Sequence, residues 1–329
     1  MKYVFKKKIY TAIFAMIDVI GNVVVFPFRR FRREAPVLAK KVLLVRVDHI
    51  GDVMTATAVL EPFKRRYPGA VIDFMAPVWA GDFLENDPFI DKHIVFNAPW
   101  FERGGSGFAA KVKGFFRMVR LIREGNYDAG IDLRGDFRHI LAMFLAGLKC
   151  RVGYGITGGG FLLTRQVPYE GRLHEAERDM ALLGPFGVKG RVNGVSLTFS
   201  AEDRKKSAEV LKEAGINGPY MVLHTVPGHA SKNWSPDNFA RLARYLMDKK
   251  KLDILMAGSA GDRGYLKDII FKGAVGAIDI SGLTNIGTLG AILEKASLFV
   301  GVDSGPAHIS AAAGIPTIVL FSGANDPAQ

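Results

Sequence analysis

The chain has 329 residues, 49% of them hydrophobic, which is enough for two domains of ordinary size, each with its own core. Its 44 Lys and Arg outnumber 32 Asp and Glu, and the formal net charge of +12 favours anionic partners such as phosphates or an acidic lipid surface. The single cysteine, Cys150, excludes an intrachain disulfide and suits a reducing cytoplasmic setting.

Residues 1–36 form a basic and apolar arm. Its first 34 residues hold eight Lys or Arg against Asp18 and Glu34, so this arm carries half of the net charge. Between two basic clusters, an apolar run over residues 9–28 approaches the ~20 residues that cross a bilayer. The run is followed by RRFRR and not by a small-residue cleavage site, which disfavours a secretory signal.

A helix drawn over this run carries one narrow polar stripe. The stripe comprises Lys7, Thr11, Asp18 and Asn22. It is typical of a helix that lies in the headgroup region with its basic ends on anionic lipid, and Pro27 is expected to end or bend the helix. We therefore expect the arm to associate with a membrane, either spanning it or lying on it. The alternative is a terminal helix that packs on the protein itself.

Residues 37–195 alternate between strand-like and helical patterns. Strands are predicted at 40–48, 70–77, 92–98 and 127–133, and helices at 53–68 and 109–124. Pro68 and Gly69 end the first of these helices. This alternation predicts a mainly parallel sheet covered on both faces, and hence a Rossmann-like first domain.

Residues 196–218 are expected to connect two domains. They contain a capping box, Ser200 with Asp203, that opens a helix closed by Gly215. From residue 219 the alternation restarts. Strands are predicted at 220–225, 252–259, 274–281, 296–303 and 316–323, with helices from Pro236, near Asp262, from Ile286 and from Pro306. Residues 219–329 thus form a second doubly wound domain, and because the sequence stops after the fifth strand we expect it to lack a closing helix.

The turn after the fourth of these strands concentrates polar residues. Asp303, Ser304, Gly305 and Pro306 come between a strand and a helix, with His308 in the first helical turn. Proline suits a first helical position, glycine lets a ligand approach the backbone, and the free N–H groups of a helix start favour an anion. The turn therefore predicts a diphosphate site. The alternative is that Ser304 merely caps the helix while Asp303 stabilises its dipole.

Two other turns of the second domain suit the same ligand. Lys232 stands just before a helix that Ser235 caps and Pro236 opens, where a lysine adds a full charge to the partial charge of the helix end. Asp262 follows a strand, where a carboxylate can accept hydrogen bonds from ribose hydroxyls. The alternatives are an ordinary solvated lysine and a capping aspartate.

In the first domain, the strand VLLVRV runs into DHIGDVMT. Gly51 gives this turn freedom, and Asp52 comes in the first turn of the following helix. A carboxylate there can take a proton from an incoming hydroxyl group, a contribution of typically ~10²–10⁴-fold. Asp48 competes for this role, and a merely capping Asp52 is the alternative.

The stretch GYGITG, residues 153–158, satisfies G-x-G-x-x-G, but the sequence after it offers no helix to hold a pyrophosphate. With Arg134, Arg138 and Arg151 upstream, it fits better as a mobile loop beside an anionic acceptor. No metal signature appears among the seven scattered histidines. Nucleic-acid binding is disfavoured, because the basic excess lies in an apolar arm and no recognition motif accompanies it.

Several stretches, in order from Lys40 to the end of the chain, together resemble glycosyltransferase family 9, the heptosyltransferases of lipopolysaccharide core assembly. They are KKVLLVRVDHIGDVMTATAVLEPFKRRYPGAVIDFM, DLRGDFRHI, RVGYG, HEAERDMALLGPFGV, MVLHTVPGHASKNWSPDNFARLA and DISGLTNIGTLGAILEKASLFVGVDSGPAHISAAAGIPTIVLFSGANDP. The most specific are RVDHIGD and VDSGPAHIS, which occur at the family's separation in one chain. The resemblance implies a GT-B architecture, with two Rossmann-like domains that face each other across a cleft.

The resemblance also implies an inverting transfer from a nucleotide-diphosphate sugar, typically ADP-heptose, with no cofactor or catalytic metal. It makes Asp52 the general base and assigns contacts with the donor phosphates to Lys232. The remaining donor-binding residues that it implies are Thr225, Asp262, Asp303, Ser304, Gly305 and His308. The segment HTVPGHASKNW departs from the family's commoner HPGA form, and the apolar arm is not typical of the family.

The sequence thus predicts an inverting glycosyltransferase at the cytoplasmic face of the bacterial inner membrane, with an anionic glycolipid as acceptor. Two alternatives stay open. One is a GT-B sugar-nucleotide epimerase that uses the same phosphate site, and the other is a catalytically silent membrane scaffold.

Overall fold

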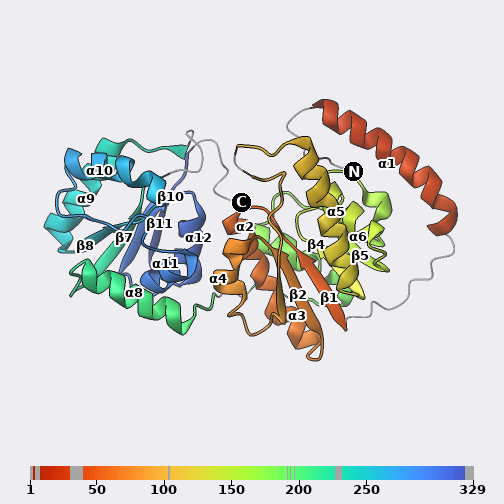
Figure 1. Cartoon of the computed structure of the whole chain (residues 1–329), viewed down its shortest axis with the longest axis horizontal. Coiled ribbons are helices and arrows are strands. Elements are labelled where there is room, and N and C mark those ends of the chain that lie inside the picture. The colour runs from red at the N-terminus through yellow and green to blue at the C-terminus, as the bar shows by residue number, and fades with distance from the viewer. Residues whose placement is uncertain are drawn as a thin grey trace. The chain divides into compact units, whose positions relative to one another are not determined.

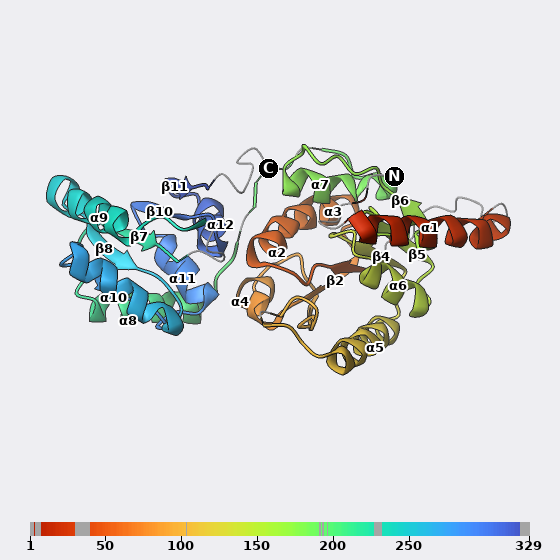
Figure 2. The same ribbon diagram turned by 90° about the horizontal axis from the view of Figure 1, so that it is seen from above.

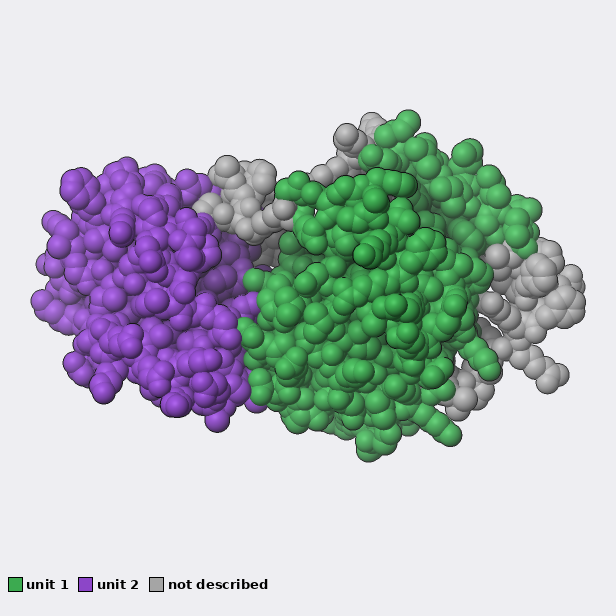
Figure 3. All heavy atoms as spheres, in the orientation of Figure 1, with its two compact units in different colours: residues 1–193 green, residues 194–329 purple. Residues whose placement is uncertain are grey.

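The computed structural model of the chain (Figure 1) describes residues 3, 8–29, 40–102, 104–190, 192, 194–195, 197–226 and 232–322, the side chains of 8 and 25–29 excepted. Lys7 of the predicted polar stripe lies outside these residues, as do residues 323–329, on which the expectation of a missing closing helix rests. The chain divides into two compact units, residues 1–193 and residues 194–329 (Figure 3). Each is described by itself.

The described residues of the first unit contain a six-stranded, all-parallel sheet in the order β3-β2-β1-β4-β5-β6. Its strands are β1 (Lys41–Val45), β2 (Val71–Ala76), β3 (Lys92–Val95), β4 (Ala129–Asp132), β5 (Cys150–Gly153) and β6 (Arg165–Gln166). β1, β2 and β4 are almost wholly buried, as expected for central strands of a sheet with both faces covered. The predicted strands are confirmed, while β5 and β6 were not predicted.

Helices precede, connect and follow these strands. They are α1 (Lys8–Arg29), α2 (Ile50–Ala56), α3 (Leu60–Arg66), α4 (Gly81–Leu84), α5 (Phe108–Glu124), α6 (Phe137–Leu145) and α7 (Glu175–Ala181). The helix predicted over 53–68 is divided into α2, a 3₁₀ turn at Thr57–Val59 and α3. Pro62 explains the division, because proline is accepted in the first turn of a helix but not in its interior.

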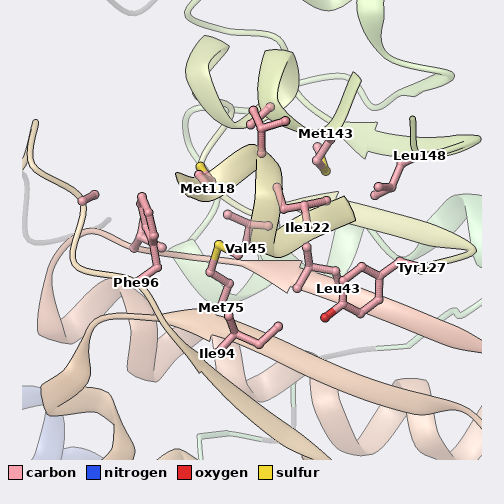
Figure 4. Packing of buried hydrophobic residues seen from close by; sticks show 14 residues of the cluster. Leu43, Val45, Met75, Ile94, Phe96, Met118, Ile122, Tyr127, Met143 and Leu148 are labelled. Carbon is pink, nitrogen blue, oxygen red and sulfur yellow. The ribbon is translucent and has the colours of Figure 1, made fainter. Parts of the chain in front are cut away.

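One core cluster of this unit lies between the sheet and helices α5 and α6 (Figure 4). Leu43 and Val45 alternate with residues of the opposite sheet face, as strand geometry requires, and pack with Met118 of α5 and Met143 of α6. This packing fixes where β1 and β4 end, and so where the polar residues after them lie.

Helix α1 lies along the outside of the first unit in both views (Figure 1, Figure 2). The helix does not end at Pro27, as one of the sequence expectations had it, but continues to Arg29. Asp18 of the predicted polar stripe is buried against the protein, where its Oδ1 accepts a hydrogen bond of 2.7 Å from the Gly159 backbone N–H. Among the described helices, none has the length and hydropathy needed to cross a membrane.

In the second unit the described residues form a five-stranded parallel sheet in the order β11-β10-β7-β8-β9. Its strands are β7 (Tyr220–His224), β8 (Asp253–Met256), β9 (Ile278–Asp279), β10 (Leu298–Val302) and β11 (Thr317–Leu320). The helices are α8 (Ala201–Glu213), α9 (Pro236–Lys250), α10 (Arg263–Lys272), α11 (Ile286–Leu293) and α12 (Gly305–Ala312). The predicted α/β class, with two doubly wound parallel sheets, is confirmed.

The predicted connector, residues 196–218, lies within the second unit. Its capping box forms as predicted, because the Ser200 hydroxyl oxygen accepts from the Asp203 N–H at 3.0 Å and the Asp203 carboxylate accepts from the Ser200 N–H at 3.2 Å. Helix α8 and the residues before it pack closely on α11, where Gly287 and Gly290 leave room for Asp203 and Phe199. The segment is therefore part of this unit's packing.

Replacing Gly290 by Ala is expected to destabilise the second unit. The added Cβ would lie 2.1 Å from the ring of the buried Phe199, so α8 and α11 would have to separate, at a cost of about 1–3 kcal/mol. Urea unfolding of the variant measures this loss. Gly264→Ala in α10, where a Cβ meets nothing within 4 Å, is the matched control and should be neutral or slightly stabilising.

Candidate functional site

In both sheets the strand order reverses direction at one point, between β1 and β4 in the first unit and between β7 and β10 in the second. Ligands of open α/β sheets bind beyond the carboxyl ends of the strands at such a point. Asp48 and Asp52 follow β1, and Arg134 and Arg138 follow β4. Thr225 follows β7, and residues 303–305 follow β10. These sequence-predicted residues thus gather in two clusters, one in each unit.

Arg46, the first residue after β1, is the centre of the first cluster. Its side chain is only 3% exposed, and its guanidinium donates to Asp48 Oδ1 at 2.8 Å and to Glu175 Oε1 at 2.8 Å. Asp52 Oδ1 lies 3.2 Å from the Nη2 of Arg46. A buried guanidinium must be surrounded by acceptors, so this residue fixes the position of all three carboxylates.

Asp52 is the most exposed carboxylate of this cluster, with 33% of its side chain accessible. Burial raises its pKa, but the hydrogen bond with His49 and the charge of Arg46 outweigh burial, so the pKa of Asp52 is well below its ordinary value. Asp48, its competitor, has a fully buried side chain bound to Arg46 and Arg134, and burial raises its pKa. Asp52 is therefore the ionised and accessible group, as a base requires.

Three residues of this cluster were missed as site residues by sequence analysis: Arg46, Glu175 and Asp179. Asp179 is fully buried, with Oδ1 3.5 Å from Arg46 Nη1, and burial raises its pKa well above the ordinary value. A charged residue inside an otherwise apolar strand must find buried partners, so Arg46 was a usable signal. Glu175 and Asp179 stand four apart on α7, the spacing that puts two side chains on one helix face.

Arg134 and Arg138 lie beside this cluster with aromatic neighbours. Arg134 is ion-paired with Asp48, and its guanidinium carbon lies 4.3 Å from the centre of the Phe101 ring. The guanidinium carbon of Arg138 lies 4.8 Å from the Trp100 ring centre. With 31% and 39% of their side chains exposed, both arginines can still offer N–H donors to an anionic or hydroxyl-rich acceptor.

The structure does not support an acceptor contact by Arg151. This residue is only 4% exposed, and its guanidinium donates to the backbone carbonyls of Leu148 and Leu162. It therefore holds the segment after β5 in place. The prediction for Arg151 is wrong, because a sequence does not show that a basic residue lies inside a strand with its charge turned to backbone oxygens.

Three groups at this site could hold a metal ion by their geometry. The ligand atoms of Asp48, His49 and Asp52 all lie within 4.8 Å of one another. Both carboxylates, however, are already paired with arginine guanidinium groups, and a divalent cation would have to approach the positive charges of Arg46 and Arg134. These pairs disfavour a cation at this position.

In the second unit, Ser304 is the N-cap residue of α12 and Gly305 begins the helix, but the Ser304 hydroxyl does not cap it. The hydroxyl donates to the Val302 carbonyl at 3.0 Å and lies 3.1 Å from Nδ1 of His224. Because its one proton goes to Val302, we infer that His224 Nδ1 donates to it. The Ser304 hydroxyl thus does not cap α12, and the N–H groups at the start of this helix remain suited to bind an anion.

His224 was not predicted as a site residue. Its side chain is buried at the end of β7, and burial lowers its pKa from 6.5 to about 4. Neutral imidazole is therefore the form that meets Ser304. A lone histidine in a strand gives no sequence signal for such a contact.

Stability of the second unit is expected to fall between pH 6.5 and pH 4 because of His224. In this window His224 is protonated in the unfolded chain and stays neutral in the folded one. The free energy of unfolding therefore decreases as pH falls, by at most about 3 kcal/mol. His224→Asn keeps a donor near Ser304 and should flatten this part of the pH dependence. Hydrogen exchange of the β7 amides at pH 7 and pH 4.5 measures it, with the exposed His308→Gln as control.

The other predicted donor-binding residues lie around the same helix start, with one exception. Lys232 Nζ lies 2.6 Å from Asp303 Oδ2, so these two predicted donor-binding residues form an ion pair. Thr225 is fully buried, and its hydroxyl has no hydrogen-bond partner within the described residues. This is expected of a polar group whose partner is a ligand. His308 is exposed in the first turns of α12. Asp262 instead accepts two hydrogen bonds from Ser259, so its contact with a ribose stays a prediction.

Comparison with known proteins shows the family of the chain. Residues 115–329 match the family model of glycosyltransferase family 9 (heptosyltransferase). The chain is 27% identical to lipopolysaccharide heptosyltransferase 3 of Escherichia coli K12 over 84% of this chain and 80% of that protein, and 24% identical to lipopolysaccharide heptosyltransferase 2 of the same strain over 85% and 82%.

Solved structures share the fold. A glycosyltransferase family 9 protein from Veillonella parvula superposes with a TM-score of 0.76 at 20% identity, covering 87% of this chain and 81% of that one. E. coli ADP-heptose lipopolysaccharide heptosyltransferase II superposes with a TM-score of 0.71 at 21% identity, covering 87% and 86%. With its family model matched over most of the sequence, the chain belongs to glycosyltransferase family 9, the heptosyltransferase family.

Proposed function

We propose that this protein transfers heptose from ADP-heptose to the lipopolysaccharide core or a related glycolipid, with inversion and without a metal ion, at the cytoplasmic face of the inner membrane. The observation that carries the proposal is the ionised, accessible Asp52 held by Arg46 at the end of β1. The names of the relatives, lipopolysaccharide heptosyltransferases, support the choice of donor and acceptor.

In the proposed reaction, Asp52 accepts the proton of an acceptor hydroxyl group while the hydroxyl oxygen attacks the anomeric carbon of the heptose. The bond between that carbon and the β-phosphate oxygen breaks, and ADP leaves with the electron pair. A single displacement inverts the configuration at the anomeric carbon. Arg134 and Arg138 would orient an anionic acceptor beside Asp52.

The leaving diphosphate needs positive charge as the bond breaks. The N–H groups at the start of α12 supply part of it, and Lys232, 2.6 Å from Asp303 beside that start, supplies a positive charge that the Asp303 carboxylate partly offsets. Thr225, whose hydroxyl has no hydrogen-bond partner among the residues that the structure describes, would offer it to the same phosphates. This protein-borne charge supports the proposal that no metal ion is required.

The test is a transfer assay with ADP-heptose and a heptose-deficient lipopolysaccharide core acceptor, after treatment of the enzyme with EDTA. We expect undiminished transfer after chelation and a product whose anomeric configuration, determined by NMR, is opposite to that of the donor. Retention of configuration, or activity restored only by a divalent metal, would contradict the mechanism.

Thermal shift with a panel of nucleotide sugars separates the alternatives. ADP-heptose should raise the melting temperature more than UDP-sugars do. A donor that is converted to its epimer without any acceptor would indicate an epimerase, and the absence of a shift with every nucleotide sugar would indicate a silent scaffold. Either result would overturn the proposed transfer.

A further inference from the structure

The polar side of helix α1 is fixed to the first unit by Asp18. This side chain is 3% exposed, and each of its carboxylate oxygens accepts a hydrogen bond: Oδ1 from the Gly159 N–H and Oδ2 from the Tyr3 hydroxyl, both at 2.7 Å. A buried carboxylate with these partners anchors the helix in one orientation. Asp18 of the predicted polar stripe therefore faces the protein and not the solvent.

Close packing reinforces this orientation. The Phe14 ring meets the Phe137 ring edge-on, with 5.3 Å between their centres. Gly21 lies so near to Phe161 that a Cβ at this position would come within 2.5 Å of its ring. Helix α1 is thus seated on the start of α6 and on the 3₁₀ turn Gly160–Leu162, and its rotation about its own axis is determined.

The opposite side of α1 exposes a large apolar surface. Its side chains are 56–70% exposed and recur at intervals of three and four residues, the spacing of one helix face. They are Ile9, Met16, Val19, Ile20, Val23 and Val24. Soluble proteins rarely expose so many large apolar side chains together unless the surface binds something.

The charges at the two ends of α1 indicate what binds its apolar face. The sequence places Lys6, Lys7 and Lys8 at one end of this helix and Arg29, Arg30, Arg32 and Arg33 at and beyond the other. A second copy of the chain would bring these like charges together, which disfavours a dimer through this face. Anionic lipid headgroups would neutralise them while the apolar face enters the acyl boundary.

We propose that α1 is a docking helix that lies flat on an anionic phospholipid bilayer, with its apolar face inserted and its polar face bound to the enzyme body. The proposal goes beyond the transfer reaction and does not rest on the identity of the sugar. The segment on which α1 is anchored is itself hydrogen-bonded to residues beside the predicted acceptor-binding Arg134. Thr157, two residues before Gly159, accepts from the Phe137 N–H at 2.8 Å and donates to the Gly135 carbonyl at 2.9 Å. Gly135 follows Arg134 directly.

The test is co-sedimentation of the intact chain with vesicles of phosphatidylethanolamine and phosphatidylglycerol. We expect binding by the wild type, weaker binding to phosphatidylcholine vesicles, and at least about a tenfold loss for the double variant Ile20→Asp/Val23→Asp. Both residues are exposed, so circular dichroism should show an intact fold. The matched control is Phe271→Asp, an 87% exposed aromatic residue on α10 of the second unit, which should bind as the wild type does.

A probe on the helix tests the orientation. In a Cys150→Ser background, a nitrobenzoxadiazole label on Ile20→Cys should shift to the blue when anionic vesicles are added, and the same label on Phe271→Cys should not. The proposal is overturned by a wild type that does not bind anionic vesicles, or by equal binding of the double variant. It is equally overturned by a dimer in light scattering that the double variant dissociates, since a second copy would then cover this face.

Discussion

Replacement of Asp52 by Asn is expected to lower the rate of heptose transfer by about 10²–10⁴-fold, the usual contribution of a positioned general base. The amide keeps the size of the side chain but cannot accept the proton of the attacking hydroxyl. Donor binding should be unchanged, because the predicted phosphate contacts lie in the second unit, at residues 303–305 and Lys232. Single-turnover transfer assays and titration with ADP-heptose measure the two quantities separately.

The controls distinguish chemistry from folding. Glu61→Gln on α3 removes another carboxylate, 49% exposed and paired with Arg65, and should transfer as the wild type does. Because its pKa is lowered, Asp52 stays ionised between pH 8 and pH 5. Protonation of this residue should therefore not lower the wild-type transfer rate in this range. Asp52→Asn with full turnover would exclude the assigned role.

Most strands could be predicted from the sequence because they are apolar runs that end in turn residues. The starts of α9 and α11, at Pro236 and Ile286, were also predicted, the first because Ser235 before it is a residue that caps helices. β5 was missed because Arg151 interrupts its pattern, and its charge was assigned to a ligand. In the structure that charge is satisfied by backbone carbonyls.

The candidate sites could be predicted only where the residue type itself carries the chemistry. Asp52, Lys232 and the turn at 303–305 were predicted in this way, and their roles stay predictions. His224 and Arg46 act through partners 80 and 129 residues away in the sequence, Ser304 and Glu175, and only the folded chain shows these contacts. The same holds for helix α1. Its periodicity predicts a polar stripe, but the sequence does not show which side of the helix packs on the protein.

Truncation of Lys232 to Ala is expected to weaken donor binding and to lower kcat by about 10²–10³-fold, as loss of a charge that stabilises the departing diphosphate does. The loss has two parts, because Asp303, 2.6 Å from Lys232 Nζ in the wild type, then loses this cation and its negative charge repels the phosphates more strongly. The double variant Lys232→Ala/Asp303→Ala should therefore bind ADP-heptose more tightly than the single variant, and Lys232→Arg should retain part of the rate. Steady-state kinetics with varied donor measure these effects, with Lys267→Ala, an exposed lysine of α10, as control. Wild-type KM and kcat in Lys232→Ala would show that the diphosphate binds elsewhere.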